Sequence, residues 1–225
     1  FDPSWRYFLN VVNGTDLKFG RDIYFTYGSL GYLFYLMKLP GNTIEYWSGI
    51  VIWGIIFLFH LWMLLQLYRL YQKGKIHFWA ITASVCCYLA GYYAPTRDNY
   101  LLYLMILAVV LWAKGAKNIV LIPNLLLLLM FFGKFSTFTS GFAFCILFCI
   151  FDVLFRKNWK SIWLFLPGII LMPVCYLVYC PSIKNLFEYV AGILKISSGW
   201  MLTMQFDSVL QPSEVRWLII LIACY

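Results

Sequence analysis

Residues 44–68 read IEYWSGIVIWGIIFLFHLWMLLQLY, a stretch in which Glu45 is the one side chain charged at neutral pH. A helix that crosses a lipid bilayer needs about 20 mostly apolar residues, so this stretch predicts a membrane-spanning helix. The whole chain has the same character, with 63% hydrophobic residues, 12% charged residues and a mean hydropathy of +0.80. This composition excludes an ordinary soluble enzyme, a disordered tail and a secreted disulfide scaffold.

Further apolar runs follow this stretch and predict an all-α, polytopic helix bundle in the membrane. The six expected spans are residues 44–68, 76–93, 99–113, 119–133, 135–155 and 162–180. The third and fourth spans are short, which requires tilt, local thinning of the bilayer or burial against neighbours. Pro123, Pro167 and Pro173 lie within the runs and are expected to kink them. His60 lies in the first span, where packing or an interhelical hydrogen bond accounts for it.

The spans divide the chain into successive parts. We expect an outward loop with an interfacial helix at residues 1–43, a six-span bundle at 44–180, an outward loop with an amphipathic helix at 181–214, and the start of a further span at 215–225. Because the chain begins at Phe1 and ends inside an apolar run, we interpret it as a portion of a longer protein.

The loops between the spans carry unequal charge. One set of loops holds eight basic residues with a single acid, Asp152, nearby. These are Arg69, Lys73, Lys75, Lys114, Lys117, Arg156, Lys157 and Lys160. The other set holds the remaining nine basic residues and eight of the nine acids. The positive-inside rule makes the first set cytoplasmic and the acids outward-facing. The net charge of +8 therefore reflects membrane orientation and not a nucleic acid partner.

Both outward loops begin with an amphipathic helical pattern. In the first, apolar residues at positions 5, 8, 9 and 12 lie opposite Arg6 and Asn10. In the second, apolar residues at positions 183, 186, 187, 190 and 194 lie opposite Lys184, Glu188 and Lys195. Helices of this kind lie in the membrane interface. They form either the floor of a site for a lipid-linked molecule or loops that rest on the lipid headgroups.

Carboxylates with neighbouring arginines are the first candidates for chemistry. Asp2 stands at the start of the first interfacial helix, and Asp98 follows Arg97 at the start of the third span. Either aspartate also fits the N-cap of a helix. Asp22 follows Arg21 on the same outward side. Such groups near a membrane bind a phosphate-bearing lipid, a divalent metal such as Mg²⁺ or Mn²⁺, or both.

Lys134 is a further candidate because it separates two very apolar spans at their outward end. A cation in this place either extends to the lipid headgroups or acts as a counter-charge for a phosphate in a cavity.

Three stretches of the chain carry a resemblance to a known superfamily. They read FDPSW at residues 1–5, FGRDIYFTYGSLGYL at residues 19–33 and TRDNYLL at residues 96–102. In these stretches the chain resembles polytopic bacterial membrane proteins related to the GT-C glycosyltransferases, the superfamily of protein mannosyltransferases and aminoarabinose transferases. The related proteins often read Tyr-Gly-Pro, whereas here Tyr27 and Gly28 are followed by Ser29.

The resemblance implies a reaction, a location and catalytic residues. The reaction is transfer of a sugar from a polyprenyl-phosphate donor to an outward-facing acceptor, with inversion, at the outer surface of a bacterial cytoplasmic membrane. An essential acid follows the first span of the superfamily, and Asp2 occupies a similar place. Asp2 is therefore expected to act as the general base on the acceptor hydroxyl. A second acidic motif, between the third and fourth spans, corresponds to Arg97 and Asp98.

The resemblance also implies which residues contact the donor. The leaving phosphate needs positive charge, for which Arg21, Arg97 and Lys134 are the candidates. Asp22 is expected to orient an arginine or, with Asp98, to share a divalent metal with the donor phosphate. Tyr27, from the Tyr-Gly motif, is assigned to the same substrate-binding set. The expected partners are the polyprenyl-phosphate sugar and the membrane lipids.

Other classes of membrane protein remain open. A transporter or flippase for a lipid-linked solute predicts polar groups deep within the spans, and these are few in the sequence. An O-antigen polymerase or ligase relies on arginines in a large outward loop, whereas residues 181–214 contain none. A purely structural membrane protein is the third alternative.

Overall fold

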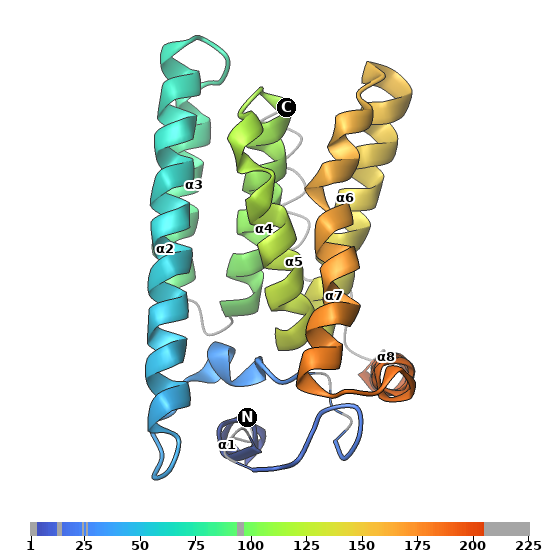
Figure 1. The fold of residues 1–225 in the computed structure, drawn as a ribbon. Helices are drawn as coiled ribbons and strands as arrows, with labels where there is room; N and C mark the ends of the chain where they lie inside the picture. The colour runs from blue at the N-terminus through green and yellow to red at the C-terminus, as the bar shows by residue number, and fades with distance from the viewer. Residues whose placement is uncertain (1–3, 13–14, 24, 26, 94–96, 205–225) are drawn as a thin grey trace.

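The computed structural model describes residues 4–12, 15–23, 25, 27–93 and 97–204, and every named element within them is a helix. Six of these helices run alongside one another as a bundle (Figure 1). They are α2 (Thr43–Gln72), α3 (Phe78–Tyr93), α4 (Arg97–Ala113), α5 (Leu121–Gly133), α6 (Phe135–Arg156) and α7 (Leu166–Tyr179). The all-α class is therefore confirmed for the part of the chain that the structure describes.

Three segments of this bundle are long and apolar enough to cross a membrane, namely Thr43–Gln72, Phe135–Arg156 and Trp159–Tyr179. Asn99–Ala113 and Leu121–Gly133 are also apolar but shorter. The chain therefore has the helices of an integral membrane protein. The further span expected near Val215 lies outside the described residues.

The span expected at residues 162–180 is divided in the structure. A 3-10 helix, η3 (Trp159–Leu164), precedes α7. Pro167 lies in the first turn of α7, where a proline interrupts no helical hydrogen bond, so it begins a helix and does not kink one. Pro123 is placed in the same way in the first turn of α5. Pro173 is the proline that lies inside its helix.

A buried amide joins α5 to the start of α7. Asn124 Nδ2 donates to the carbonyl oxygen of Trp163 at 2.9 Å, and Asn124 Oδ1 accepts from the Gly168 amide at 2.6 Å. The first amides of a helix lack intrahelical partners, so Asn124 caps α7 from a different helix. A Cβ at residue 168 would lie 3.1 Å from Asn124 Oδ1, so glycine is the residue that allows this approach.

A polar cluster joins α2, α3 and α4 inside the bundle. His60 is fully buried, with Nδ1 2.6 Å from the Tyr100 hydroxyl and Nε2 3.5 Å from the Ser84 hydroxyl. The Ser84 hydroxyl also hydrogen-bonds to that of Tyr103. His60 therefore has interhelical hydrogen bonds of the kind that stabilise helix association in lipid.

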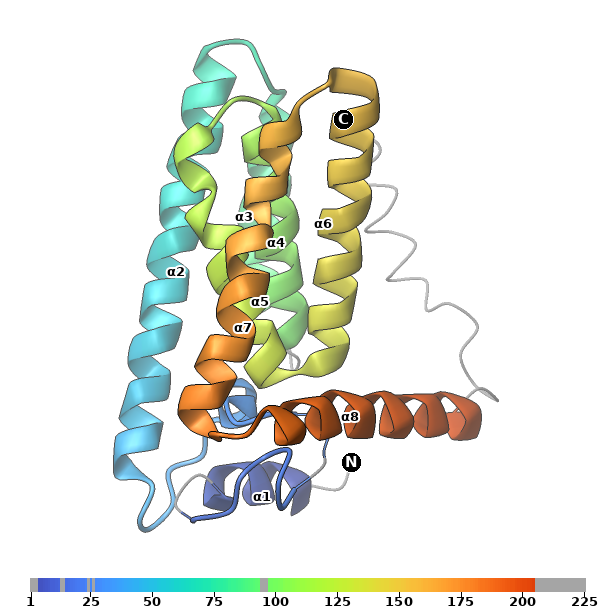
Figure 2. The same ribbon diagram turned by 45° about the vertical axis from the view of Figure 1, so that its right-hand side comes forward.

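A second layer lies across one end of the bundle (Figures 1 and 2). It contains α1 (Ser4–Val12), the 3-10 helix η1 (Gly31–Tyr35) and α8 (Ile183–Met204). We call this layer, with residues 15–23 and 27–30, the platform. The start of α6 and the ends of α5 and α7 meet the platform.

The opposite end carries the basic loops, and we call it the basic end (Figure 1). The α2–α3 turn, the 3-10 helix η2 (Lys117–Ile119) and the α6–η3 turn lie there. Gly74 and Gly115 follow α2 and α4 with φ angles of 65° and 100°, in the left-handed region that commonly terminates helices. Which end faces the cytoplasm stays a prediction of the charge distribution.

Candidate functional site

The platform is attached to the bundle through the loop at residues 15–23. The Phe19 amide donates to the Tyr179 hydroxyl at 3.0 Å, and the Tyr176 hydroxyl donates to the Phe19 carbonyl at 3.0 Å. The Tyr176 hydroxyl also lies 3.1 Å from the Asn185 carbonyl, at the start of α8. Two tyrosines at the end of α7 therefore hold an N-terminal loop and a C-terminal helix together.

Tyr27 and Lys134, 107 positions apart in the sequence, are paired in an isolated antiparallel bridge. The Gly28 amide donates to the Gly133 carbonyl at 3.0 Å, and the Leu30 amide donates to the Phe132 carbonyl at 2.8 Å. These bonds satisfy carbonyls at the end of α5, where the helix itself supplies no donor. Lys134 Nζ lies 5.3 Å from the centroid of the Tyr27 ring, within the range of a cation–π contact.

Lys134 stands at the junction of two helices, with the C-terminus of α5 before it and the N-terminus of α6 after it. Its backbone is extended, with φ −140° and ψ 111°, so α5 ends and α6 begins on either side of it. The first turn of α6 contains no acidic residue, and the N-cap residue Lys134 makes no side-chain capping hydrogen bond. The amides at a helix N-terminus and its dipole favour an anion. A half-buried lysine beside such a terminus is chemically suited to a phosphate or carboxylate.

Arg21 and Asp22 form an ion pair at 2.7 Å in an exposed turn. Asp22 Oδ2 also accepts from the Lys18 amide at 2.9 Å, and Arg21 Nη2 donates to the Asp16 carbonyl at 3.2 Å. The hydrogen bond to Arg21 lowers the pKa of Asp22, and the same bond raises the pKa of Arg21. Both side chains therefore stabilise this turn, Asp22 through the Lys18 amide and Arg21 through the Asp16 carbonyl.

This turn and the Tyr27–Lys134 pair make their contacts at different helix ends, although Tyr189 lies beside both Gly20 and Gly28. Lys18 Nζ is 5.0 Å from the centroid of the Tyr179 ring, which places the turn beside the end of α7. Tyr27 and Lys134 instead lie at the α5–α6 junction. Among the residues expected to bind the donor, the described contacts therefore bring Tyr27 and Lys134 together and join Arg21 to Asp22 in a separate pair.

Arg97 and Asp98 are the first two residues of α4, and their side chains lie outside the described part of the structure. The contacts of Tyr100, two residues after Asp98, show what the first turn of α4 packs against. Tyr100 packs against Trp53, with ring centroids 6.2 Å apart, and Trp53 Nε1 donates to the Leu33 carbonyl of η1 at 2.7 Å. The start of α4 is thus linked to η1 through one tryptophan. Asp2 lies outside the described residues.

The pattern of α1 is only partly as expected. Leu9 and Val12 are buried, as their spacing indicates, but Asn10 is buried as well, with 1% of its surface exposed. The expectation that Asn10 belongs to the polar face is therefore wrong. Its Nδ2 donates to the Tyr35 carbonyl at 2.8 Å, and its Oδ1 accepts from the Met37 amide at 3.1 Å. The amide joins α1 to the segment that follows η1.

In α8 the face that packs against protein is centred on residues that the sequence analysis missed. Tyr189 and Ile193 are buried, whereas Ile183, Phe187 and Leu194 are exposed. The Tyr189 hydroxyl donates to the Phe131 carbonyl at 3.4 Å, and burial raises the pKa of Tyr189. The spacing of Tyr189 and Ile193 by four residues is a helical signal, but a run rich in apolar residues does not show which stripe meets protein.

A metal centre finds no support among the described residues, which contain no group of three or more His, Cys, Asp or Glu side chains suited to hold an ion. The two aspartates expected to act in catalysis have side chains outside that set.

Comparison with known proteins adds no family to these observations. No family model, curated protein or solved structure matches the chain. The fold by itself defines an all-helical bundle of the membrane type, with a platform across one end.

Proposed function

We propose that the chain is a membrane-embedded transferase that moves a sugar from a polyprenyl-phosphate donor to an acceptor at the platform end of the bundle. The observation that carries this proposal is the pairing of Tyr27 with Lys134 at the N-terminus of α6. A lysine, a helix terminus and an aromatic ring meet there at the edge of an apolar bundle. These surroundings suit a phosphate linked to a long apolar chain.

The donor phosphate is the group that these residues would bind. Lys134 and the first amides of α6 supply positive charge for the leaving phosphate, which carries its negative charge without needing a proton. The acceptor hydroxyl does need a base, and the assignment of Asp2 to this role rests on the resemblance alone. A divalent metal would be held by Asp98 together with Asp22, an assignment that also rests on the resemblance.

The platform supports the approach of a lipid-linked substrate. α8 exposes Ile183, Phe187 and Leu194 while Lys184 and Lys195 are also exposed on the same helix. A helix with apolar and basic exposed residues lies at the boundary between acyl chains and headgroups. A polyprenyl phosphate has its phosphate at this depth, so donor and platform would meet without either leaving the interface.

A transporter for a lipid-linked solute is the second candidate, and the polar cluster around His60 is the observation that bears on it. This cluster lies within the bundle, as a transport path requires. His60, however, has no exposed surface, and its ring nitrogens face Tyr100 and Ser84. A cluster that hydrogen-bonds internally favours a structural role over a path, so the transferase is the better supported function.

Transfer by membranes that contain the full chain tests the proposal, with polyprenyl-phosphate hexoses and pentoses as donors. Lys134→Met is expected to lower the transfer rate roughly 100-fold, because one charge that stabilises the leaving group is lost. Lys134→Arg should retain most of the rate. Lys38→Met is the matched control, since Lys38 is exposed on the segment that follows η1. Equal rates for Lys134→Met and Lys38→Met would remove Lys134 from the site.

Two further measurements separate the alternatives. Asp2→Asn and Asp98→Asn should each abolish transfer if these carboxylates act in catalysis. Movement of a labelled polyprenyl-phosphate sugar across vesicles that contain the protein, without any transfer to an acceptor, would instead favour the transporter.

A further inference from the structure

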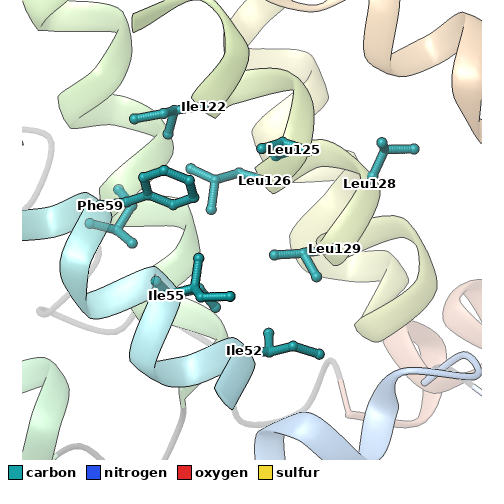
Figure 3. A pocket seen from close by; sticks show the side chains of 10 residues that line it. Ile52, Ile55, Phe59, Ile122, Leu125, Leu126, Leu128 and Leu129 are labelled. Atoms are coloured by element: carbon teal, nitrogen blue, oxygen red, sulfur yellow. The ribbon is translucent and has the colours of Figure 1, made fainter. Parts of the chain in front are cut away.

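An apolar crevice of about 230 Å³ lies between α2 and α5 (Figure 3). Its walls are Ile52, Ile55, Ile56 and Phe59 from α2, Leu104 from α4, and Ile122, Leu125, Leu126, Leu128 and Leu129 from α5. The crevice exists because α5 packs on α4, α6 and α7 whereas α2 packs on α3 and α4, which leaves α4 as the floor between them. In lipid no hydrophobic force closes such a gap, since an acyl chain fills it as well as side chains do.

A polar pocket lies next to the crevice, between α2 and the connection from α4 to α5. This second hollow, of about 260 Å³, is lined by Trp62, Gln66, Gly115, Ala116 and Asn118. On α2, Phe59, Trp62 and Gln66 are three and four residues apart, so they share one helix face. On the side opposite α2, Asn118 of the pocket precedes Ile122 of the crevice by four residues. We call the crevice and the pocket together the α2–α5 slot.

The length and polarity of the slot match one leaflet of a bilayer. From Ile52 to Gln66 the slot follows α2 for 14 residues, or roughly 21 Å at the helical rise. This is about half of the roughly 40–45 Å thickness of a bilayer with its headgroup regions, or one leaflet together with its headgroups. The lining is apolar over most of this length and becomes polar at the basic end. An occupant therefore has a long apolar part and a polar head that points to the basic end.

The positive charge around the polar pocket favours an occupant with an anionic headgroup. Lys75 Nζ lies 3.8 Å from the position that a Cβ would take on Gly115, so the ammonium group is beside the pocket wall. Gln66, Asn118 and the Trp62 indole add side-chain N–H groups to the lining. Residues 69–80 and 113–121, which form this part of the basic end, contain no acid. A phosphate is the anion that a membrane supplies at this depth.

We propose that the α2–α5 slot holds one anionic glycerophospholipid, with its phosphate in the polar pocket beside Gly115 and Lys75 and an acyl chain along the crevice. Basic pockets between membrane helices bind anionic headgroups in this way. The lipid is distinct from the proposed sugar donor, because the phosphate of the donor lies at the platform end, beside Lys134. Such a lipid fills the space between α2 and α5 and so holds the two parts of the bundle together.

Lipid retention by the full chain tests this proposal. The protein is purified in mild detergent, incubated with equal amounts of dioleoyl phosphatidylglycerol and dioleoyl phosphatidylcholine, and examined by native mass spectrometry. We expect one phosphatidylglycerol to be retained per chain in preference to phosphatidylcholine. Lys75→Gln should lower this retention about fivefold, the factor that corresponds to about 1 kcal/mol for one basic residue near an anionic headgroup.

Matched variants separate the slot from the basic end as a whole. Lys160→Gln removes an exposed charge at the same end but outside the slot, and it should leave retention unchanged. Leu125→Phe narrows the crevice and should lower retention, whereas Leu147→Phe, on the exposed face of α6, should not.

Two results would overturn the proposal. Equal retention of the two lipids by the unmodified protein would show that the pocket does not select an anionic headgroup. Equal effects of Lys75→Gln and Lys160→Gln would show that the retained lipid is attracted by the general charge of the basic end and not by the slot. Neither result depends on transferase activity.

Discussion

At the platform end, the last carbonyls of α5 are met by amides from residues 28 and 30, more than 100 positions earlier in the chain. At the basic end, by contrast, α2 and α4 finish with turns built from their own last residues. The Gly74 amide donates to the Tyr71 carbonyl at 2.8 Å, and the Gly115 amide donates to the Trp112 carbonyl at 2.9 Å. One end of the bundle is therefore closed by distant segments and the other mainly by local turns.

This difference indicates where a site can be built. A local turn satisfies the backbone but brings together only neighbours in sequence. Docking of distant segments places side chains such as Tyr27 and Lys134 side by side at fixed geometry. It also makes the platform end more sensitive to small steric changes, because close approach of two backbones leaves no room for an added Cβ.

The largest effect is expected from Gly28→Ala. A Cβ at this position would collide with the Tyr189 hydroxyl and with the Phe132 carbonyl, and a backbone carbonyl has little freedom to move. We expect a loss of about 3 kcal/mol in the free energy of unfolding, measured by denaturation in mixed micelles. Gly54→Ala is the control, since nothing lies within 4 Å of its Cβ position. Equal stability of the two variants would contradict the docking described for the platform.

Asn124→Leu tests the exception at the basic end, where a distant side chain does cap a helix. The substitution leaves the Gly168 amide and the Trp163 carbonyl without their partner in a buried place. We expect a loss of about 2 kcal/mol in the free energy of unfolding. Asn124→Asp keeps the acceptor for the Gly168 amide but loses the donor to the Trp163 carbonyl. Its loss of unfolding free energy should be smaller than that of Asn124→Leu where the carboxyl group is protonated, and larger where it is ionised. Stability equal to that of the unmodified protein would show that the cap is not needed.

His60→Phe tests the middle of the bundle, which belongs to neither end. Phenylalanine keeps an aromatic ring against Tyr100 but removes the hydrogen bonds to Tyr100 and Ser84. Interhelical hydrogen bonds in membranes contribute modestly, so we expect a loss of about 1 kcal/mol in the free energy of unfolding. A loss larger than that of Gly28→Ala would contradict the view that the platform end is the more sensitive region.

The smallest effect is expected from Asp22→Asn, because the Arg21–Asp22 pair is exposed to solvent. The pKa of Asp22 is lowered from its ordinary value of 3.8, so the carboxylate stabilises the folded turn above that pH. The difference between the unmodified protein and Asp22→Asn should be constant from neutral pH to about 4 and disappear as pH falls below 3.8 through the folded pKa. Protease cleavage within residues 15–23 as a function of pH measures this. A difference in cleavage between the two proteins that grows at low pH would contradict this prediction.

The sequence predicted the helices much better than it predicted their contacts. Each of the six apolar runs contains a helix, because hydrophobic length and the backbone's need for internal hydrogen bonds in lipid leave few other structures. The stripe of α8 that packs against protein was not predicted, because an apolar side chain that faces lipid and one that faces protein look alike in a sequence. Asn10 was misjudged because its partners, at residues 35 and 37, lie at the end of η1 and just after it, far from α1 in the sequence.

The class of protein, the positions of the helices and the separation of the basic loops from the acidic segments could all be predicted from the amino-acid sequence. These follow from local quantities, namely apolar length and the charge of each loop. The contact between Tyr27 and Lys134, the pairing of Arg21 with Asp22 and the slot between α2 and α5 became visible only in the folded chain. Those features depend on which helices pack closely and which diverge, and this is set by the fit of many side chains at once.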